Sequence, residues 1–555
     1  MSENLTLYLY CFTIFYDKNE LNRSIMSKIF KKIVTFLVVA ALSSSLFACE
    51  FNPSDSGSAG GSSGGSQLKP GDVELTFVSI NDLHGSIEQN ENGTAGISNT
   101  AAAIDKLSAN YEKSGKDVRD DIVLFGNGDM FQGTAISNMS KGRSVIEAMN
   151  DMRFDGMGLG NHEFDWGLDS VTAYFDGDKS NGEANFPLVA ANVYKKSASG
   201  YIADLSNDDN VVNGVIVEKS GVKVGLIGVI GPCENSILAT MVSDYSFRKD
   251  YITERVKKVA LELKNDGAEI ISLNIHYDDY YNEEFASLES DGDYLIDVIF
   301  NGHSHSTYSK EVKRPDGSLI PAVQGGSNNK AFAYVKLTYS TENGHIEYNN
   351  YRYEKITEKN TVYDKKVEAT VRNYKESLLS SLPVLAVSSV TISDRYAISD
   401  YVSKVAISAL GTDYFASNYG GLRSTGNITA GNPIKEDAFY KIIPFDNSMY
   451  VVRMQGDGIY KFCTEQSSYN YYGYRKGVKQ PEELEGDMNY YTVAIIDYVY
   501  LGEYFQPYME YVDEKNTANT QLYLRDMLVE DARLCGKANM RWNYNNTPFI
   551  TKLDF

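Results

Sequence analysis

Cysteine and basic residues are scarce in this chain of 555 residues, which has 5 cysteines and 52 Lys and Arg side chains. So few cysteines over this length exclude a small disulfide-stapled protein. The 74 acidic side chains give a formal net charge of −22. This charge argues against binding of a nucleic-acid polymer, because a polyanion repels a polyanionic backbone unless a local basic patch compensates. The length indicates two or more domains.

An export signal is predicted near the amino terminus. Three lysines within residues 28–32 precede the apolar stretch 33–42, which is too short to span a bilayer as a stable helix. The following Leu-Phe-Ala-Cys resembles a bacterial lipobox, which predicts a lipoprotein signal peptide over residues 26–48 and lipidation of Cys49. An ordinary signal peptide with an incidental cysteine is the alternative.

The segments around this signal complete the predicted location. Residues 1–25 precede a better start at Met26 and are predicted to be a mis-assigned start or an extension. Residues 49–71 are rich in Ser and Gly and are predicted to form a flexible tether. We therefore expect an extracytoplasmic protein, lipid-anchored to a bacterial membrane on its periplasmic side or at the cell surface. The anchor is its only expected membrane contact.

The remaining cysteines leave one pairing open. Cys233 lies in the first predicted domain, while Cys463 and Cys535 both lie in the second. A disulfide between Cys463 and Cys535 and two buried thiols are both compatible with the sequence.

Short apolar runs recur over residues 72–354, and several are separated by helical patterns. This alternation predicts an α/β domain. Residues 355–383 are charged and helix-prone and are predicted to be a linker helix, followed by a smaller α/β or α+β domain over residues 384–555. The predicted strands are 73–80, 122–125, 222–230, 269–275 and 297–300, and the clearest helices are 97–110 and 251–265.

Five of the six histidines lie in polar segments, several of them directly after predicted strands. In open α/β sheets, binding sites form beyond the carboxyl ends of strands. Imidazole and carboxylate donors suit zinc, manganese, iron or cobalt, and more than four candidates fit two metals that share a carboxylate. A single structural metal, or unconnected turn, cap and core roles, are the alternatives. The candidate ligands are Asp82, His84, Asp129, Asn161, His276, His303 and His305.

These segments resemble the motifs of the calcineurin-like metallophosphoesterases. They most resemble the exported 5′-nucleotidase group, which includes UDP-sugar hydrolases and 2′,3′-cyclic-nucleotide phosphodiesterases. The resemblance covers about residues 73–555 and implies a four-layer αββα catalytic domain followed by a substrate-binding domain. The matching segments are Asn-Asp-Leu-His-Gly, Gly-Asp-Met-Phe-Gln-Gly, Gly-Asn-His-Glu-Phe-Asp, a strand-terminal His and Gly-His-Ser-His.

The resemblance implies a role for each of these residues. His162 would contact the phosphate and stabilise charge that develops in the transition state or on the leaving oxygen, and Asp165 would orient His162. The nucleophile would be a metal-bound hydroxide. The expected cofactors are two divalent ions (Zn, Mn, Co or Fe). One would be held by Asp82, His84, bridging Asp129 and His305, and the other by Asp129, Asn161, His276 and His303.

Two arginines of the second domain are expected to bind phosphate. Residues 418–423 read Asn-Tyr-Gly-Gly-Leu-Arg and resemble the family's Asn-x-Gly-Gly-Ile-Arg segment. The resemblance implies that Asn418 and Arg423 contact substrate, and a guanidinium fork suits a phosphate. A surface ion pair is the alternative for Arg423. Arg395 corresponds loosely to a second family arginine.

Recognition of a nucleobase rests on fewer matches. Residues 444–447 resemble the family's Pro-Phe-Gly-Asn, in which Phe445 would stack on the base and Asn447 would contact it. A core role for Phe445 is the alternative. The family's late Gly-Gly-Asp-x-Tyr segment is absent, and Tyr498 and Glu503 stand where its second ring and acidic contact would be.

The sequence thus predicts a dimetal phosphohydrolase, a 5′-nucleotidase that converts nucleoside 5′-phosphates to nucleoside and phosphate. A 2′,3′-cyclic-nucleotide phosphodiesterase or a UDP-sugar hydrolase is the alternative within the class. From another class, a non-enzymatic surface binding lipoprotein on the same scaffold remains, although none of the expected ligand positions is empty.

Overall fold

The computed structural model describes residues 68–89, 96–197, 199, 202–207, 211–356 and 362–553. The predicted signal peptide, Cys49 and most of the tether lie outside these residues. The described residues belong to one compact unit, Ala59–Phe555. Over these ranges, no helix combines the length and the apolar character that a bilayer crossing requires.

The first sheet has seven strands in the order β18-β17-β1-β2-β3-β4-β7. Strand β1 pairs in parallel with β2 and antiparallel with β17. The side chains of β2 are buried along its whole length, as expected for a central parallel strand covered on both faces. The strands are β1 (Asp72–Ile80), β2 (Ile122–Asn127), β3 (Gly156–Gly158), β4 (Leu188–Val189), β7 (Val211–Val212), β17 (Ala331–Ser340) and β18 (Ile346–Lys355).

The second sheet has six strands in the order β15-β16-β14-β11-β9-β8. Its four inner strands are parallel, and both edge strands are antiparallel. Two small sheets, β10-β5-β6 and β12-β13, lie outside it. The strands are β8 (Gly214–Lys219), β9 (Val222–Ile230), β11 (Ile270–His276), β14 (Val298–Asn301), β15 (Thr307–Lys313), β16 (Leu319–Gly325), β5 (Tyr194–Lys196), β6 (Ile202–Asp204), β10 (Tyr245–Ser246), β12 (Glu289–Ser290) and β13 (Asp293–Tyr294).

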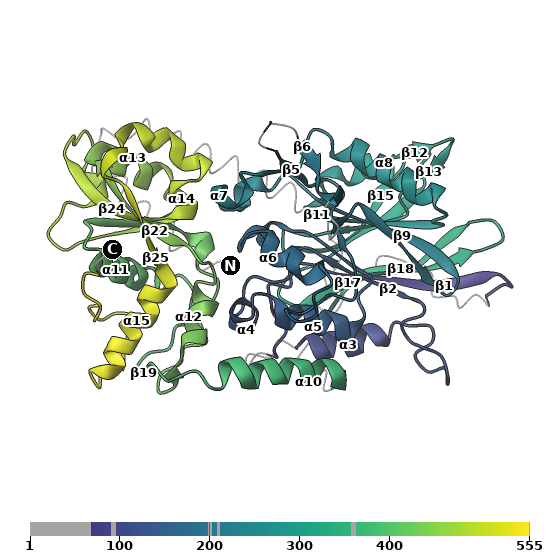
Figure 1. Ribbon diagram of the computed structural model, residues 1–555, viewed down its shortest axis with the longest axis horizontal. Helices are drawn as coiled ribbons and strands as arrows, with labels where there is room; N and C mark the ends of the chain where they lie inside the picture. Colours follow the sequence, from purple (N-terminus) through teal and green to yellow (C-terminus); the bar gives the residue numbers. More distant parts are fainter. Residues whose placement is uncertain are drawn as a thin grey trace, which may run out of the picture. The chain divides into compact units, whose positions relative to one another are not determined.

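The two sheets pack face to face and are covered by helices on their outer faces (Figure 1). Apolar side chains of β1, β2, β9 and β11 form the core between the sheets. The first sheet packs against α3 and α5, and the second packs against α8. This is the predicted four-layer αββα architecture, which the structure confirms. The helices are α3 (Ile97–Asp105), α4 (Ala135–Met139), α5 (Arg143–Met152), α6 (Asp169–Thr172), α7 (Ala239–Val242), α8 (Ile252–Asn265) and α9 (Asn282–Ala286).

Helix α8 agrees with its predicted range, whereas α3 is shorter than predicted. In α8 the buried residues recur every three or four positions, from Ile252 to Leu263, which gives the helix one apolar face. Helix α3 ends at Asp105 because the chain beyond it makes other hydrogen bonds. The carboxylate of Asp121 accepts from the hydroxyl of Ser108 and from the backbone N–H of Ala109.

The predicted linker helix is also shorter than expected. Strand β18 extends to Lys355, and helix α10 (Lys365–Tyr374) starts only after Asp364, whose carboxylate accepts from two backbone N–H groups of the first turn. A π-helical turn, Lys375–Leu379, continues α10. Helix α10 packs against α3 and α5 and thus belongs to the outer layer of the first sheet.

Strands after residue 385 form two sheets of their own, in the orders β23-β20-β24-β22-β25 and β21-β19-β26. Helices α11 and α15 pack together in this part. All three cysteines in the described ranges are buried free thiols, so Cys463 and Cys535 are not paired. The elements are β19 (Ala386–Ser388), α11 (Ser399–Leu410), β20 (Tyr414–Asn418), β21 (Pro433–Ile434), α12 (Glu436–Ile442), β22 (Ser448–Gln455), α13 (Gly456–Glu465), β23 (Asn470–Tyr474), β24 (Tyr490–Ile496), α14 (Asp497–Tyr500), β25 (Ala518–Tyr523), α15 (Leu524–Lys537) and β26 (Arg541–Trp542).

Candidate active site

The candidate ligands lie at the carboxyl ends of parallel strands from both sheets. In the first sheet, β1 ends two residues before Asp82, and β2 ends two residues before Asp129. In the second sheet, β11 ends at His276 itself, and β14 ends two residues before His303. Because the sheets pack face to face, these four strand ends bring donors from distant parts of the sequence together.

The first group of donors contains Asp82, His84, Asp129 and His305, with one donor atom of each lying within 4.8 Å of the others. The Nε2 atoms of His84 and His305 are 3.0 Å apart. Nδ1 of His84 lies 3.1 Å from the carbonyl oxygen of Gln132, which can only accept. Nδ1 therefore carries the proton, and the lone pair on Nε2 points into the group.

The second group contains Asp129, His276 and His303, again with donor atoms within 4.8 Å of one another. Oδ1 of Asn161 lies 2.9 Å from Nδ1 of His303 and 3.3 Å from Nε2 of His276. The carbonyl oxygen of Asn127 lies 2.9 Å from Nδ1 of His276, so Nδ1 donates this hydrogen bond and Nε2 is left as the atom that can bind a metal. Asp129 belongs to both groups, as a bridging carboxylate would.

The donor chemistry fits divalent cations. Asp82 is fully buried, and its Oδ1 atom makes no hydrogen bond of good geometry, although Nε2 of His305 lies 3.4 Å away. Its Oδ2 atom accepts from the amide of Asn81 and from the backbone N–H of His303. A buried carboxylate oxygen without a donor is costly unless a cation faces it. The structure brings all seven predicted ligands together, and their assignment to individual metals stays a prediction.

The buried carboxylates of Asp82 and Asp129 need a positive charge nearby. Burial disfavours the imidazolium form of His276, but Asp129 and Asp82 raise the pKa of this histidine to about 10. Burial lowers the pKa of His84 to about 3, although Asp129 acts in the opposite direction. A metal ligand must be neutral imidazole, so a bound divalent cation would displace the Nε2 proton of His276 and would itself supply positive charge beside Asp82 and Asp129.

The backbone of this site is held in a rare conformation. Asp82, His84, Asp129, His303 and His305 all have positive φ angles between 49° and 66°. Residues other than glycine reach this left-handed region at a cost, and such residues cluster at functional sites. Backbone hydrogen bonds hold two of these turns, from the N–H of Asp82 to Gly128 and from the N–H of His84 to Asp129.

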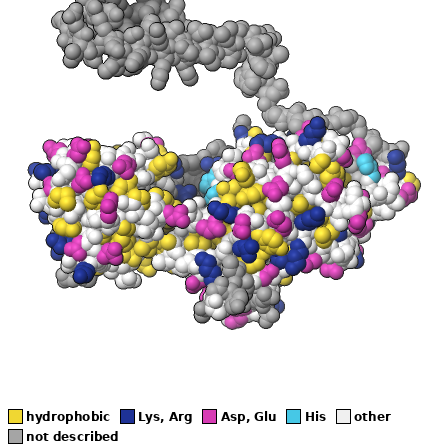
Figure 2. Space-filling model, turned by 90° about the horizontal axis from the view of Figure 1, so that it is seen from above, with side chains coloured by type: hydrophobic (Ala, Val, Ile, Leu, Met, Phe, Trp, Pro, Cys, Tyr) yellow, Lys and Arg dark blue, Asp and Glu magenta, His cyan; other side chains and the backbone are white. Residues whose placement is uncertain are grey.

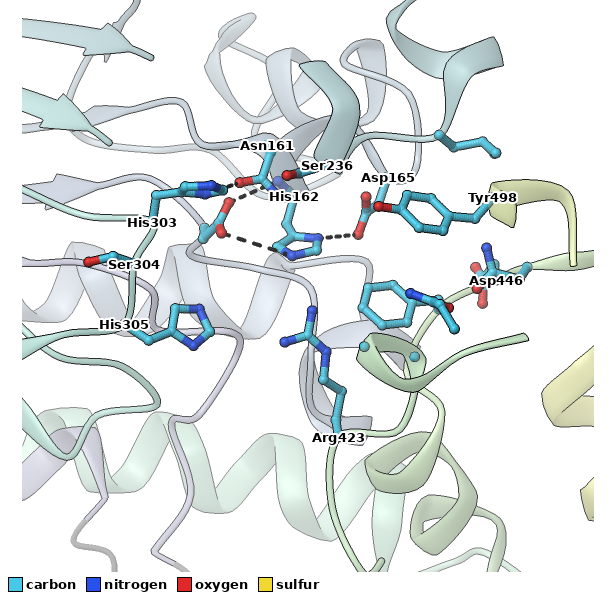
Figure 3. A pocket seen from close by; sticks show the side chains of 17 residues that line it. Asn161, His162, Asp165, Ser236, His303, Ser304, His305, Arg423, Asp446 and Tyr498 are labelled. Atoms are coloured by element: carbon cyan, nitrogen blue, oxygen red, sulfur yellow. Dashed lines mark hydrogen bonds and ion pairs between the residues drawn. The ribbon is translucent and has the colours of Figure 1, made fainter. Parts of the chain in front are cut away.

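His162 lies beside the donor groups and is oriented by Asp165. Its Nδ1 atom is 2.8 Å from Oδ2 of Asp165, and its Nε2 atom is 4.0 Å from Oδ2 of Asp129. Burial disfavours the charged ring, but both carboxylates more than offset this and raise the pKa of His162 above its ordinary value. The two carboxylates thus favour the protonated form of the ring, which faces the space in front of the donors (Figure 3).

Glu163 supports this arrangement and was given no role from the sequence. Its buried carboxylate accepts from three backbone N–H groups, those of Asp129, Met130 and Gly160, at 2.7–2.8 Å. It thereby connects the turn after β2 to the 3₁₀ turn Asn161–Phe164. Glu163 directly follows Asn161 and His162 in the motif Gly-Asn-His-Glu, and this position in the sequence could have identified it as part of the site.

A cavity of about 350 Å³ opens in front of the donors. Histidine side chains reach the surface at a hollow in the space-filling view (Figure 2). Arg423 projects into the cavity toward the space between His162 and His305 (Figure 3). Within the described residues no carboxylate pairs with Arg423. Its guanidinium lies over the ring of Phe445, 5.0 Å from the centroid. The surface ion pair that was the alternative for Arg423 is therefore not seen among the described residues.

The predicted base-binding residues also line this cavity, but each has protein partners. Phe445 packs with its ring centroid 5.6 Å from that of His162. The side-chain amide of Asn447 donates to Asp497, and the hydroxyl of Tyr498 donates to the carbonyl oxygen of Asn235. The cavity lining also includes Asn418.

Two further residues lie elsewhere. Arg395 lines a neighbouring cavity and not this one. Glu503 accepts from the amide of Asn235 and is not part of the cavity lining. The predicted acidic contact to a base is therefore not placed to reach this cavity in the structure.

The loop with Phe445 is anchored by contacts that the sequence did not reveal. The amide of Asn138 on α4 donates to the carbonyl oxygen of Pro444. Asp446 forms ion pairs with Lys141, at 3.0 Å, and with the buried Arg525. The loop 444–447 is thus tied both to the turn after α4 and to α15.

Comparison with known proteins gives one family match over part of the chain. The calcineurin-like phosphoesterase family matches residues 75–307. A 5′-nucleotidase of Vibrio cholerae is 28% identical over 313 residues, covering 53% of this chain and 51% of that protein. Endonuclease YhcR of Bacillus subtilis is 27% identical over 427 residues, covering 71% of this chain and 33% of that protein. The chain spans between a third and about half of the length of such relatives.

Solved structures show the same fold. A 5′-nucleotidase precursor from Thermus thermophilus superposes with a TM-score of 0.65 at 20% identity, covering 87% of this chain and all of that one. A putative 5′-nucleotidase from Staphylococcus aureus gives a TM-score of 0.61 at 16% identity. Residues 75–307 thus match the calcineurin-like phosphoesterase family, and the chain has the fold of solved 5′-nucleotidase structures.

Proposed function

We propose that this protein is a dimetal phosphohydrolase that releases orthophosphate from phosphomonoesters, foremost nucleoside 5′-phosphates. The observation that carries this proposal is the convergence of two donor groups on Asp129, with Arg423 and His162 facing the same space. The two donor groups would bind two cations, and Arg423 and His162 would add two positively charged side chains around one tetrahedral phosphate.

Each side chain has a defined task in this proposal. Arg423 offers guanidinium N–H groups that match two phosphate oxygens at once. His162, held by Asp165, donates to an equatorial oxygen or to the departing oxygen of the alcohol. When bound, two divalent cations would neutralise phosphoryl charge and lower the pKa of a water nucleophile. Zinc, manganese, cobalt and iron all suit a site of imidazole, amide and carboxylate donors.

A nucleoside is the proposed leaving group. Phe445 and Tyr498 add aromatic surface to the cavity, on which a base can stack. The relatives named 5′-nucleotidase support the same choice. Phe445 also packs on His162, so its ring contributes to the phosphate end of the cavity as well.

The direct test is phosphate release by purified protein from AMP and UMP, with manganese, cobalt or zinc supplied separately. We expect turnover with at least one metal and none after chelation. Absence of phosphate release with every metal, from these nucleotides and from general phosphatase substrates, would refute the hydrolase. Stoichiometric metal binding without turnover would instead support a binding protein on the same scaffold.

Phosphodiester hydrolysis is a second candidate. It is favoured by the relative named endonuclease, because an endonuclease cleaves phosphodiesters. Activity on 2′,3′-cyclic AMP or on a UDP-sugar that exceeds activity on AMP would select this alternative.

We also propose that the protein acts outside the cytoplasm, attached through a lipid on Cys49. The lipobox-like segment and its basic, apolar lead-in support this proposal. A cell wall protein of Listeria monocytogenes, 24% identical over 542 residues, supports a surface location. Membrane fractionation of the Cys49→Ser variant tests it, with release from the membrane as the expected result.

A further inference from the structure

A second cavity, of about 370 Å³, adjoins the candidate active site. The two cavities share His305 and Arg423 in their linings. Unlike the first cavity, the second has no Phe, Tyr or Trp in its lining, and Pro444 is its one apolar side chain. This composition is unsuited to a nucleobase and suited to a small, strongly hydrated polar group.

The charged side chains around this cavity are mostly basic. Lys330, Arg395, Arg423 and Lys441 line it, opposed by Glu88 alone. Glu88 forms an ion pair with Lys375, which offsets its negative charge. The remaining positive charge is unusual in a protein with a formal net charge of −22.

Most of these cations have no carboxylate partner among the described residues. Lys441 pairs with Asp437 at 3.3 Å. In the described part of the chain, no carboxylate pairs with Lys330, Arg395 or Arg423. Arg395 instead stacks on Tyr396, with 4.6 Å between its guanidinium and the ring centroid. Guanidinium and ammonium groups together offer many N–H donors and no acceptor.

We propose that this second cavity is an oxyanion subsite beside the phosphate site, with Lys330 and Lys441 as its new binding groups. They would act next to Arg395, for which the resemblance already implies a phosphate contact, and Arg423 lies between the two sites. Its ligand is a tetrahedral phosphate group. That group is either a second phosphoryl group of the substrate or an orthophosphate that has left the first site. The identification of the first site rests on the proposed function, whereas the second cavity rests on its own residues.

The test is a count of bound orthophosphate on the full-length, metal-loaded protein, measured by titration calorimetry. We expect Lys330→Ala with Lys441→Ala to remove one bound phosphate, or to weaken its binding by at least about tenfold, since charged hydrogen bonds are lost. The double substitution to arginine keeps the charge and should retain that phosphate. Lys106→Ala, an exposed lysine outside both cavities, should change nothing.

The number of phosphates lost on substitution decides the proposal, and it does not depend on turnover. Equal phosphate binding by wild type and the double alanine variant would overturn the subsite. If the protein lacked phosphatase activity but still lost one phosphate on substitution, the subsite would stand and the proposed function would fall. If the double alanine variant loses one phosphate and the double arginine variant keeps it, the positive charge of these side chains is the cause.

Kinetics then separates the two sources of the ligand. A rise of about tenfold in KM for ADP, with KM for AMP unchanged, assigns the subsite to a second phosphoryl group. Weaker product inhibition by orthophosphate, with both KM values unchanged, assigns it to released phosphate. Either result supports the oxyanion subsite.

Discussion

Nδ1 of His162 lies 2.8 Å from Oδ2 of Asp165, and this contact keeps a buried imidazole basic. Asp165→Asn removes the charge that offsets burial, so the pKa of His162 should fall. Because the protonated ring is the proposed donor, the alkaline limb of the pH–kcat profile should move to lower pH while the metal content per chain stays unchanged. An unmoved alkaline limb would contradict the role of this pair.

Loss of His162 and loss of Asp129 should have different consequences. His162→Ala should retain both metals and lose roughly 10²–10⁴-fold in kcat, because a positioned proton donor is removed. Asp129→Ala should lose metal and activity together. Metal analysis of both variants decides between the roles, with His345→Ala, at an exposed histidine outside the site, as the control. Equal metal loss in both variants would reject the role of His162.

Gly160 should be essential for the donor arrangement. A Cβ atom there would lie 2.3 Å from Oδ1 of Asp129 and 2.8 Å from Cε1 of His276. Gly160→Ala must therefore displace candidate ligands of both groups, and we expect lost metal binding in a folded protein. Gly158→Ala is the matched control, since its Cβ would come no closer than 3.3 Å to any atom, the nearest being in the ring of Phe125. Circular dichroism and metal titration measure the two effects, and normal metal binding by Gly160→Ala would contradict the geometry.

Asp446 should make stability depend on pH. Burial raises the pKa of its carboxyl, but Arg525 and Lys141 more than offset this and hold the pKa below its ordinary value of 3.8. The ionised form therefore stabilises the fold above the unfolded pKa, and the stabilisation is lost as pH falls through the folded pKa. Asp446→Asn should cost about 1–3 kcal/mol at neutral pH.

Urea unfolding of wild type and Asp446→Asn between pH 3 and pH 7 measures this effect. The difference between the two unfolding free energies should shrink as the pH falls below about 4. A constant difference over the whole range would show that the substitution acts through packing alone.

Much of the fold was predictable because its central strands are continuously apolar. Strand β9 has the predicted bounds, and β11 lies within one residue of its prediction. Such apolar runs are buried on both faces of the sheet, so their local composition is enough to predict the strand from the sequence. Helix α3 was overestimated because the hydrogen bonds of Asp121 end it, and these come from a residue beyond the helix.

The donor groups were predictable for a related reason, since each follows a strand whose end position is set by the sheet. The residues that line the cavities in front of the donor groups were harder to predict. The anchoring of Pro444 by Asn138 joins residues 306 positions apart, and no local pattern encodes it. The placement of Arg395 in the second cavity and the packing of Phe445 on His162 likewise depend on tertiary contacts between distant segments.

The positive φ angles of five candidate ligands have a consequence for the order of assembly. These left-handed backbone angles are unfavourable in an isolated peptide, so the surrounding sheets have to hold them. We therefore expect the donors to converge only after both sheets have formed and packed. Cations would then enter a finished scaffold, and their uptake would report on completed folding and not initiate it.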